Sequence, residues 1–347
     1  MSGLKTGVVV LLTVLLAGCM RESDFRQPNT NRGNMQALWQ LIDERYCFLD
    51  EKGIDWERIG RQYLAAADTV SEGDERALFG LMASMLDSLR DGHVNLYSPF
   101  DVSRNKAWYE GYPDNYDDEI VYSDRYLGDD YHLAGGLQYR HIDDSVGLIR
   151  YPSFQTAFGL SNMNYVLHHF IDCKGIILDV RDNGGGFLDY SYRLAATFFD
   201  EAVCVGYIRH KTGAGHADFS PEEQMTVDPS QAGTRWLRPV VVLCNRNTYS
   251  AANHFVNAMR YAPNCLIIGC RTGGGGGLPM SYELPNGWIV RFSAVPMTDR
   301  DRQSIEDGIE PHLRVDYTDA AVALGEDRLI ETARQIILKA YQNNETN

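Results

Sequence analysis

Ser250 and its neighbours have the residue types that nucleophilic chemistry requires. This serine follows the apolar run 239–244 by a few residues, within Asn-Arg-Asn-Thr-Tyr-Ser-Ala-Ala (245–252). Such a position presents a hydroxyl at a strand end beside a helix N-terminus, where free N–H groups and the helix dipole favour developing negative charge. The structural alternative is that Ser250 or Thr248 serves only as an N-cap.

A serine nucleophile needs a base, and His93 in Arg-Asp-Gly-His (90–93) is the first candidate. His254 is a rival. It lies four residues further along the same predicted helix as Ser250, so it could not easily reach forward over the hydroxyl. Glu306 could orient a histidine, as the third member of a triad does.

Glycines could supply backbone donors to the same site. The segment Asp-Asn-Gly-Gly-Gly (182–186) follows the apolar run 175–180, and its glycines allow N–H groups to point into a cleft, as an oxyanion hole requires. A phosphate loop is excluded because no Gly-Lys-Ser/Thr follows and the surroundings are acidic. Neither Cys-x-x-Cys nor His-Glu-x-x-His spacing occurs, so we expect neither a metal nor an organic cofactor.

The elements that must position these residues alternate between strand and helix patterns. Apolar runs typical of buried strands lie at 146–151, 175–180, 239–244 and 265–269, and helical patterns at 157–172, 188–199, 250–261 and 326–342. This alternation predicts an α/β layer with crossover βαβ units, completed by a β-hairpin at 282–292.

The chain divides into three predicted structural parts. Amphipathic stripes over residues 34–98 indicate a helical subdomain, and the acidic, Tyr-rich segment 99–145 reads as a connection. Residues 146–343 then form the core that carries Ser250.

The first residues are typical of an exported protein. Residues 1–18 combine Lys5 with the apolar run 8–16, which is too short to span a bilayer and fits a signal peptide. Leu-Ala-Gly-Cys (16–19) resembles the bacterial lipobox, which implies lipidation of Cys19, a tether over residues 19–33, and attachment to a membrane of a bacterial cell envelope on its periplasmic or surface side. An ordinary signal peptide with a chance cysteine is the alternative.

The charge balance excludes some partners. With 32 Lys and Arg against 47 Asp and Glu, the formal net charge is −15, which argues against nucleic acid. The sequence does not indicate an oligomeric state.

The segments around His93, Gly185, Ser250 and Glu306, in this order, resemble the tail-specific or C-terminal-processing serine peptidases over roughly residues 34–318. The resemblance implies a ClpP/crotonase-like core and a protein or peptide substrate. It also implies Ser250 as nucleophile, with an oxyanion hole formed by the N–H of Ala251 and that of Gly185 or Gly186.

The sequence departs from that family at one catalytic position. Many members pair the serine with a lysine in Gly-x-x-Thr-x-Gly-Lys-Gly, whereas residues 269–276 here place Gly275 where the lysine would stand. The branch that resembles the tricorn protease core uses instead a histidine and a glutamate, matched by His93 and Glu306. In that branch a serine precedes the histidine, and here this position is Gly92.

Three weaker expectations accompany the resemblance. Arg271 and Gly273 are candidate substrate contacts, with a surface role for the arginine as the alternative, and the run 273–277 is expected to form a flexible wall of the cleft. Residues 94–145 are too few for a PDZ domain, so none is expected.

The expected function is therefore that of an exported, lipid-anchored serine endopeptidase with a Ser-His-Glu acyl-enzyme mechanism. Two alternatives stay open: a catalytically inactive peptide- or ligand-binding protein on the same fold, and an esterase.

Overall fold

The structure, a computed structural model, describes residues 21–22 and 27–345 of the 347-residue chain. Within them, the larger sheet has the strand order β13-β10-β9-β6-β5-β4-β3. Its strands are β3 (His132–Ala134), β4 (Leu137–Asp143), β5 (Val146–Arg150), β6 (Gly175–Asp179), β9 (Val240–Cys244), β10 (Cys265–Gly269) and β13 (Leu313–Arg314). The strands from β5 to β13 run parallel, and β4 and β3 continue the sheet in antiparallel fashion. Every residue of β5, β6 and β9 is buried, which explains their continuous apolar sequences.

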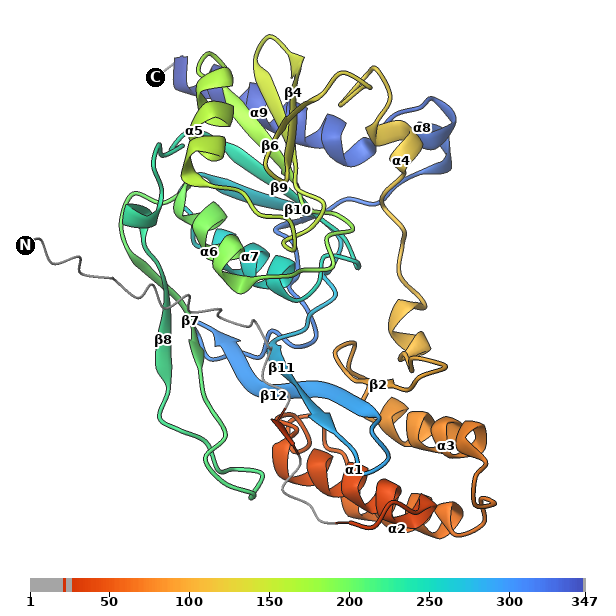
Figure 1. The fold of residues 1–347 in the computed structure, drawn as a ribbon. Helices are drawn as coiled ribbons and strands as arrows, with labels where there is room; N and C mark the ends of the chain where they lie inside the picture. Colours follow the sequence, from red (N-terminus) through yellow and green to blue (C-terminus); the bar gives the residue numbers. More distant parts are fainter. Residues whose placement is uncertain (1–20, 23–26, 346–347) are drawn as a thin grey trace, which may run out of the picture.

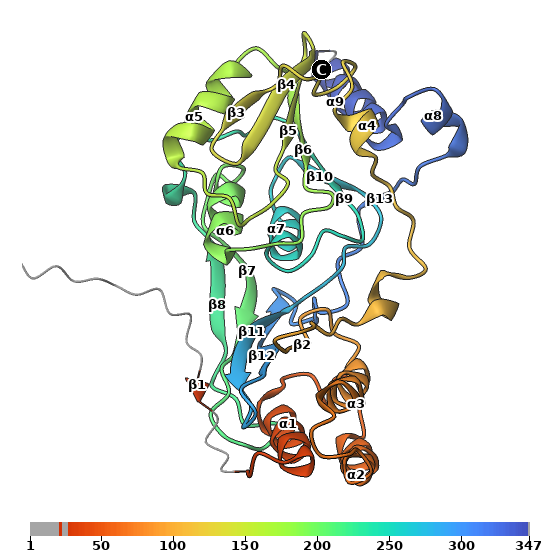
Figure 2. The ribbon, with the colours of Figure 1, turned by 45° about the vertical axis from the view of Figure 1, so that its right-hand side comes forward.

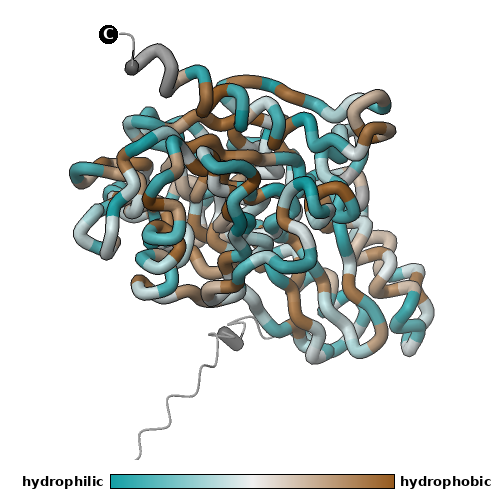
Figure 3. The backbone as a smooth tube through the Cα atoms, turned by 90° about the horizontal axis from the view of Figure 1, so that it is seen from above, coloured by the Kyte–Doolittle hydropathy of each residue, from teal (hydrophilic) through white to brown (hydrophobic). Residues whose placement is uncertain are grey.

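Helices cover both faces of this sheet. The helices α5 (Leu160–His169), α6 (Leu188–Ala196) and α7 (Ala251–Met259) lie on one side, and α4 (Asp118–Val121) and α9 (Arg328–Glu345) lie on the other, near α8 (Asp319–Ala323) (Figure 2). Side chains of β6 alternate between the two cores: Ile176 and Leu178 join the α5–α7 side, and Ile177 joins the α9 side. The hydrophobic stretches accordingly run through the middle of the molecule (Figure 3).

A second sheet lies beside the first, toward the N-terminal helices (Figure 1). Its strands are β1 (Arg21–Glu22), β11 (Gly277–Glu283), β12 (Ile289–Asp299), β7 (Val203–Ile208) and β8 (Glu223–Val227), with β2 (Asn95–Tyr97) also paired to β12. The helices α1 (Asn31–Arg45), α2 (Trp56–Ala67) and α3 (Glu75–Asp87) pack on it and share a core with Val290 and Phe292 of β12. Short 3₁₀ turns at Lys106–Tyr109 and Pro229–Gln231 complete the elements.

The α/β class, the crossover units, the N-terminal helices and the hairpin of β11 and β12 agree with the sequence prediction. The predicted boundary at residue 146 does not, because β3 and β4 extend the larger sheet into the segment expected to be a connection. Residues 132 and 133 are exposed, and this half-solvated edge lacks the apolar run that marked the central strands. The strands β7 and β8 were also not predicted.

The predicted signal peptide and Cys19 lie outside the described residues. Across the described part of the chain, no helix combines the length and the apolar character needed to cross a membrane.

Candidate active site

Ser250 stands at a sharp turn between β9 and α7. Its backbone angles are φ 55° and ψ −121°, a conformation that L-residues rarely adopt and that costs about 1–3 kcal/mol. Neighbouring hydrogen bonds hold the turn: the Ser250 N–H donates to the Gly274 carbonyl at 2.8 Å, and the Tyr249 N–H donates to the Asn183 carbonyl at 3.0 Å. The Thr248 hydroxyl donates to the Val180 carbonyl at 2.8 Å, which ties the turn to the end of β6.

The Ser250 hydroxyl is not used as a helix cap. Ser250 occupies the N-cap position of α7, but its side chain accepts no hydrogen bond from the first turn. Its Oγ lies instead 3.0 Å from Nε2 of His93. The structure thus brings the predicted nucleophile and the predicted base, which are 157 positions apart, to hydrogen-bonding distance.

His93 is held firmly in its orientation. Its backbone N–H donates to Oδ1 of Asp91 at 2.7 Å, and its ring packs against that of Tyr249 with the centroids 4.7 Å apart. On the far side of the ring, Nδ1 lies 3.5 Å from the Ser293 hydroxyl, a long contact, and hydrogen bonding by Ser293 also helps to hold the pKa of Asp91 below its usual value. A hydroxyl therefore reaches the histidine from β12, although position 92 is glycine.

Glu306 is buried near the site, but the structure does not place it against His93. Its Oε1 pairs with Nζ of Lys52 at 2.9 Å, and its Oε2 accepts the Gly276 N–H at 2.9 Å. Lys52 also donates to the Tyr46 hydroxyl, which in turn donates to Oδ2 of Asp91, both at 3.0 Å.

These contacts form one buried chain, which we call the relay: Ser250, His93, Ser293, Asp91, Tyr46, Lys52 and Glu306. Within the relay, Asp91 is the carboxylate nearest to the base. Glu306 lies at the opposite end and acts on the base only through other residues.

Burial dominates the titration of the groups in this relay. Burial lowers the pKa of His93 to about 4, because Asp91 offsets it only partly while Arg291 and Lys52 lower it further. Burial would raise the pKa of Asp91, but Lys52, His93 and hydrogen bonds hold it below its usual value. Burial and the nearby Asp91 raise the pKa of Glu306 to about 8, although Lys52 opposes the shift. The base is therefore neutral near pH 7, as proton abstraction requires.

Two backbone donors lie beside Ser250. Gly185 and Gly186 have φ of +93° and +143°, and a Cβ on Gly185 would come within 2.8 Å of the Ser250 Cβ, so the loop approaches the serine closely. The Gly185 N–H donates to Oδ1 of Asn183 at 2.9 Å and is occupied. No hydrogen bond found in the described residues uses the N–H of Gly186 or of Ala251, so these two remain as the oxyanion donors.

A cavity of about 140 Å³ opens beside Ser250 and is lined by Gly186, Leu188, Ser250, Ala251, His254, Gly275, Gly277, Leu278, Pro279, Arg291 and Met297. Neither predicted substrate contact lines it: Arg271 pairs with Glu310 at 3.4 Å, and the Gly273 carbonyl accepts the Trp108 indole N–H. The glycine run does form part of the wall. It is buried and hydrogen-bonded to residues 248 and 306, which differs from the flexible wall expected.

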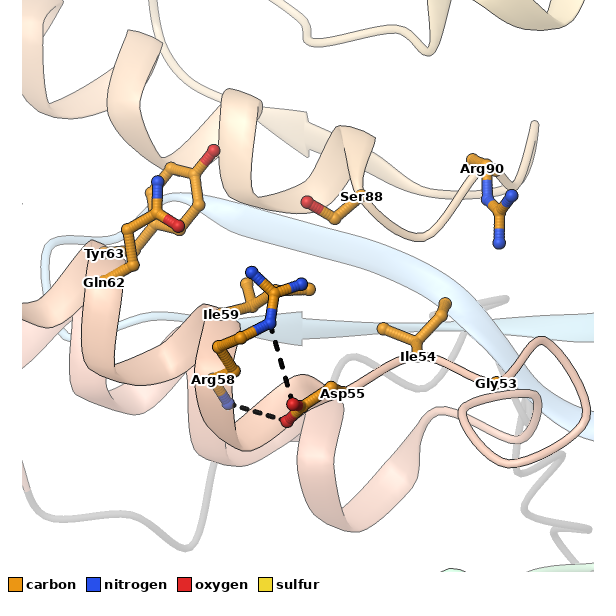
Figure 4. Close-up of a pocket in the computed structure, with 9 residues that line it drawn as sticks. All are labelled: Gly53, Ile54, Asp55, Arg58, Ile59, Gln62, Tyr63, Ser88 and Arg90. Atoms are coloured by element: carbon orange, nitrogen blue, oxygen red, sulfur yellow. Dashed lines mark hydrogen bonds and ion pairs between the residues drawn. The ribbon is translucent and has the colours of Figure 1, made fainter.

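Another hollow lies between α2 and the segment after α3 and is lined by Arg58, Tyr63, Ser88 and Arg90 among others (Figure 4). Arg58 there pairs with Asp55, and the hollow shares no lining residue with the cavity beside Ser250. Among the described residues, no group of three or more His, Cys, Asp or Glu is arranged to hold a metal ion.

Comparison with known proteins points to one family. The sequence model of peptidase family S41 matches residues 145–315, and that of the tricorn protease C1 domain matches residues 27–87. A solved structure of a putative peptidase from Parabacteroides merdae ATCC 43184 is 46% identical, covers 89% of this chain and 97% of its own, and superposes with a TM-score of 0.83. The chain belongs to peptidase family S41. This family is one of serine-type peptidases.

More distant relatives and structural neighbours extend the comparison. The carboxy-terminal processing protease CtpA of Bacillus subtilis (strain 168) is 28% identical over 182 residues, which are 52% of this chain and 37% of CtpA. This chain thus spans only about a third of the curated relatives that it matches. Mature CPAF shares the fold, with 13% identity, a TM-score of 0.68 and coverage of 91% of this chain and 98% of its own.

A lysine at position 275, where the resemblance would place one, fits neither the backbone conformation there nor the space beside His93. Gly275 has φ of +83°, and a Cβ there would meet the Tyr249 ring at 2.8 Å and Cε1 of His93 at 3.0 Å. In this S41 chain the space beside the serine is filled by the His93 imidazole.

Sequence reasoning missed several residues of the site. Lys52, Tyr46 and Ser293 carry no motif, and their roles arise from contacts between distant elements. A partial signal existed for Arg291, because this charged residue alternates with apolar Val290 and Phe292 in the predicted β-hairpin.

Proposed function

We propose that this protein is an exported, lipid-anchored serine endopeptidase that cleaves peptide bonds through an acyl-enzyme on Ser250. The observation that carries the proposal is the 3.0 Å contact between Ser250 Oγ and His93 Nε2, at a strained turn next to two backbone N–H groups without intramolecular partners in the described residues. A serine that served only as a helix cap or as a packing residue would not need these three features together.

In the proposed reaction, Nε2 of His93 takes the Ser250 proton as Oγ bonds to the carbonyl carbon, and the carbonyl π electrons move to its oxygen. The N–H groups of Ala251 and Gly186 stabilise that oxyanion. The tetrahedral intermediate then expels the amine, which receives the proton from His93. Water repeats the sequence on the acyl-enzyme and releases the acid.

The imidazolium formed in this reaction needs a compensating negative charge. We assign that role to Asp91 acting through Ser293, because Ser293 lies between Nδ1 of His93 and the carboxylate, whereas Glu306 is engaged by Lys52. Glu306 then takes part only indirectly, by holding the lysine that keeps Asp91 ionised.

This role of Ser293 has a direct test. Ser293→Ala should lower kcat about 10- to 100-fold through loss of hydrogen bonding to the base, with little change in KM. Ser191→Ala is the matched control, since both serines are fully buried and Ser191 only donates to the Leu188 carbonyl in α6. Equal kcat losses in the two variants would contradict the assignment.

The proposed location rests on the first residues, which lie outside the described part. The signal-like run 8–16 followed by Leu-Ala-Gly-Cys19 supports lipidation at Cys19 and retention at a bacterial envelope membrane. Metabolic labelling with an alkynyl fatty acid should mark the wild-type protein and not Cys19→Ser. Labelling of both would show that Cys19 is not the acylated residue.

The names of the relatives support a preference for chain ends. Because CtpA is called a carboxy-terminal processing protease, we propose that this protein cleaves near the C-terminus of protein substrates. Equal cleavage of matched substrates with free and with extended C-termini would contradict this part while leaving the chemistry intact.

The test of the chemistry is labelling by a fluorophosphonate, which reacts with activated serines. We expect one label at Ser250, none in Ser250→Ala, and a rate lowered by at least about 100-fold in His93→Ala. Ser191→Ala should label like the wild type, and circular dichroism should show that every variant is folded. A folded wild type that takes no label would overturn the hydrolase proposal in favour of ligand binding on this fold.

A further inference from the structure

The wall of the cavity beside Ser250 contains two polar groups that the chemistry above does not use. Arg291 and His254 both line it, and the other non-glycine side chains of the wall, apart from Ser250 itself, are apolar. Neither group takes part in oxyanion stabilisation or in the relay. Their position next to the nucleophile makes them candidates for substrate contacts.

The backbone of Arg291 is fixed within a sheet, and its side chain lines the cavity beside Ser250. Arg291 lies in β12, where it pairs in register with Ser281 of β11 on one side and Asn95 of β2 on the other. Alternate residues of a strand share a face, so Arg291 lies on the same face as Ser293, which contacts His93. Its charge acts on His93 directly.

The Arg291 guanidinium has no protein counter-ion in the described residues. It is half-buried, takes part in no ion pair there, and none of the residues that line the cavity is Asp or Glu. Two other arginines near this sheet are neutralised: Arg260 pairs with Asp299, and Arg302 pairs with Glu222. A partly desolvated cation without a partner is costly unless a ligand supplies the opposite charge.

His254 provides the second, independent observation. It is 2% exposed, and both of its ring nitrogens are buried without a hydrogen-bond partner. Buried polar groups in native proteins are nearly always satisfied, and exceptions often mark ligand sites. Burial lowers its pKa to about 3, so near pH 7 it is a neutral imidazole with one N–H to donate.

We propose that this cavity is a specificity pocket for a substrate carboxylate, which Arg291 binds as an ion pair and His254 as a hydrogen bond. The proposal rests on the proposed function and adds its substrate class. A cavity of about 140 Å³ suits one side chain and not a larger ligand, whose sites are typically roughly 300 Å³ or more. The apolar wall formed by Leu188, Leu278 and Met297 fits the methylenes that would carry the carboxylate.

The carboxylate has two possible sources: a Glu or Asp side chain next to the scissile bond, or the free C-terminus of the substrate. Either one would also shield His93 from Arg291 and so favour the imidazolium formed during attack. The chemistry recognised is the same, and the experiment separates the sources.

The test measures binding, so that it does not depend on turnover. Dye-labelled Ala-rich peptides are titrated into the Ser250→Ala protein and followed by fluorescence anisotropy. One peptide carries Glu and an amidated C-terminus, a second carries Gln and an amide, and a third carries Gln and a free carboxylate. We expect a carboxylate peptide to bind about 10- to 100-fold more tightly than the Gln amide, as a charge-assisted contact gives.

Variants then test whether Arg291 causes the preference for carboxylate peptides. Ser250→Ala/Arg291→Gln should erase the preference, and Ser250→Ala/Arg291→Lys should restore part of it, since lysine keeps the charge without the fork. Ser250→Ala/Arg302→Gln is the control, because Arg302 is exposed and paired elsewhere. Equal binding of all three peptides, or a preference that survives Arg291→Gln in a protein with an unchanged melting curve, would overturn the proposal.

The outcome is distinguishable from that for the hydrolase proposal. Absence of fluorophosphonate label on intact Ser250 counts against catalysis, while the anisotropy assay still decides the pocket. Conversely, an Arg291→Gln enzyme that takes label normally but no longer distinguishes Glu from Gln peptides would show that Arg291 selects substrates and does not perform chemistry.

Discussion

Lys52 and Glu306, 254 positions apart, form an ion pair of 2.9 Å in which the two side chains are only 9% and 4% exposed. The pair joins the loop after α1 to the segment that follows β12, and it lies at the end of the relay that leads to His93. Breaking a buried pair by removing one partner costs far more than the pair itself contributes, because a charge is left uncompensated.

Lys52→Met should therefore destabilise the protein by about 3 kcal/mol at pH 9, above the Glu306 pKa of about 8, where this carboxyl is ionised in the wild type. Urea unfolding measures this loss of stability. The double variant Lys52→Met/Glu306→Gln should regain part of that loss, since no isolated carboxylate remains at position 306. Arg58→Met, which removes a pair that is 65% and 60% exposed (Figure 4), is the control and should change the stability by less than about 1 kcal/mol. A single and a double variant of equal stability would show that the charge of Glu306 is not the cause.

The raised pKa of Glu306 predicts a pH dependence of stability. Its folded pKa of about 8 exceeds the unfolded value of about 4.3, so the native state binds more protons between those values, and stability from this group falls as pH rises through them. The side chain of Glu306→Gln cannot ionise. The stability of this variant relative to that of the wild type should therefore rise from pH 5 to pH 8 by up to ~1.4 kcal/mol per pH unit. His93 contributes the opposite slope in both proteins, so it cancels in the difference. A difference that is constant with pH would mean that Glu306 stays ionised in the folded state.

The lowered pKa of His93 predicts an unusual acid limit for catalysis. With a pKa of about 4, the imidazole is a free base above about pH 5. The rate of fluorophosphonate labelling should stay level from pH 8 to pH 5 and fall to half near pH 4. Because the probe does not titrate in this range, the profile reports the enzyme alone. A midpoint near 6.5, the ordinary value for histidine, would show that the base is solvated and not held as described.

The fold could largely be predicted from the sequence because its central strands are buried on both faces. Such strands are continuous apolar runs, and β5, β6, β9 and β10 were found in that way. Two of the missed strands lie at edges: β3 has two exposed residues of three, and β8 has three of five. Edge strands lack the apolar signal because only one face of them meets a core.

The residues of the candidate site likewise divide into those that the sequence indicated and those that it did not. Ser250 and His93 sit in short motifs whose residue types are set by local chemistry, so the sequence could indicate them. Lys52 and Ser293 reach the relay only through tertiary packing of α1, β12 and the loops between them, and nothing in their neighbours marks them. The resemblance placed Glu306 beside His93, whereas in the structure it pairs with Lys52, which belongs to no motif.

Gly275 permits a last prediction with a closely matched control. Gly275 and Gly287 have nearly the same φ, +83° and +82°, but a Cβ on Gly275 would press on the Tyr249 ring and His93 Cε1, at 2.8 and 3.0 Å. On Gly287 the nearest atom would be a Glu283 carboxylate oxygen at 3.8 Å. The two positions therefore share the backbone strain and differ in the contact with the base.

Gly275→Ala should lower the fluorophosphonate labelling rate by at least about 100-fold because His93 is displaced from Ser250. Gly287→Ala should cost about 1 kcal/mol of stability from the strained φ and leave labelling unchanged. Gly275→Lys, which restores the residue type common in the family, should also be inactive, since its stem occupies the place of the imidazole. Labelling that survives in Gly275→Lys/His93→Ala but is lost when Ser250→Ala is added would instead mean that a lysine can replace His93 as the base on this backbone.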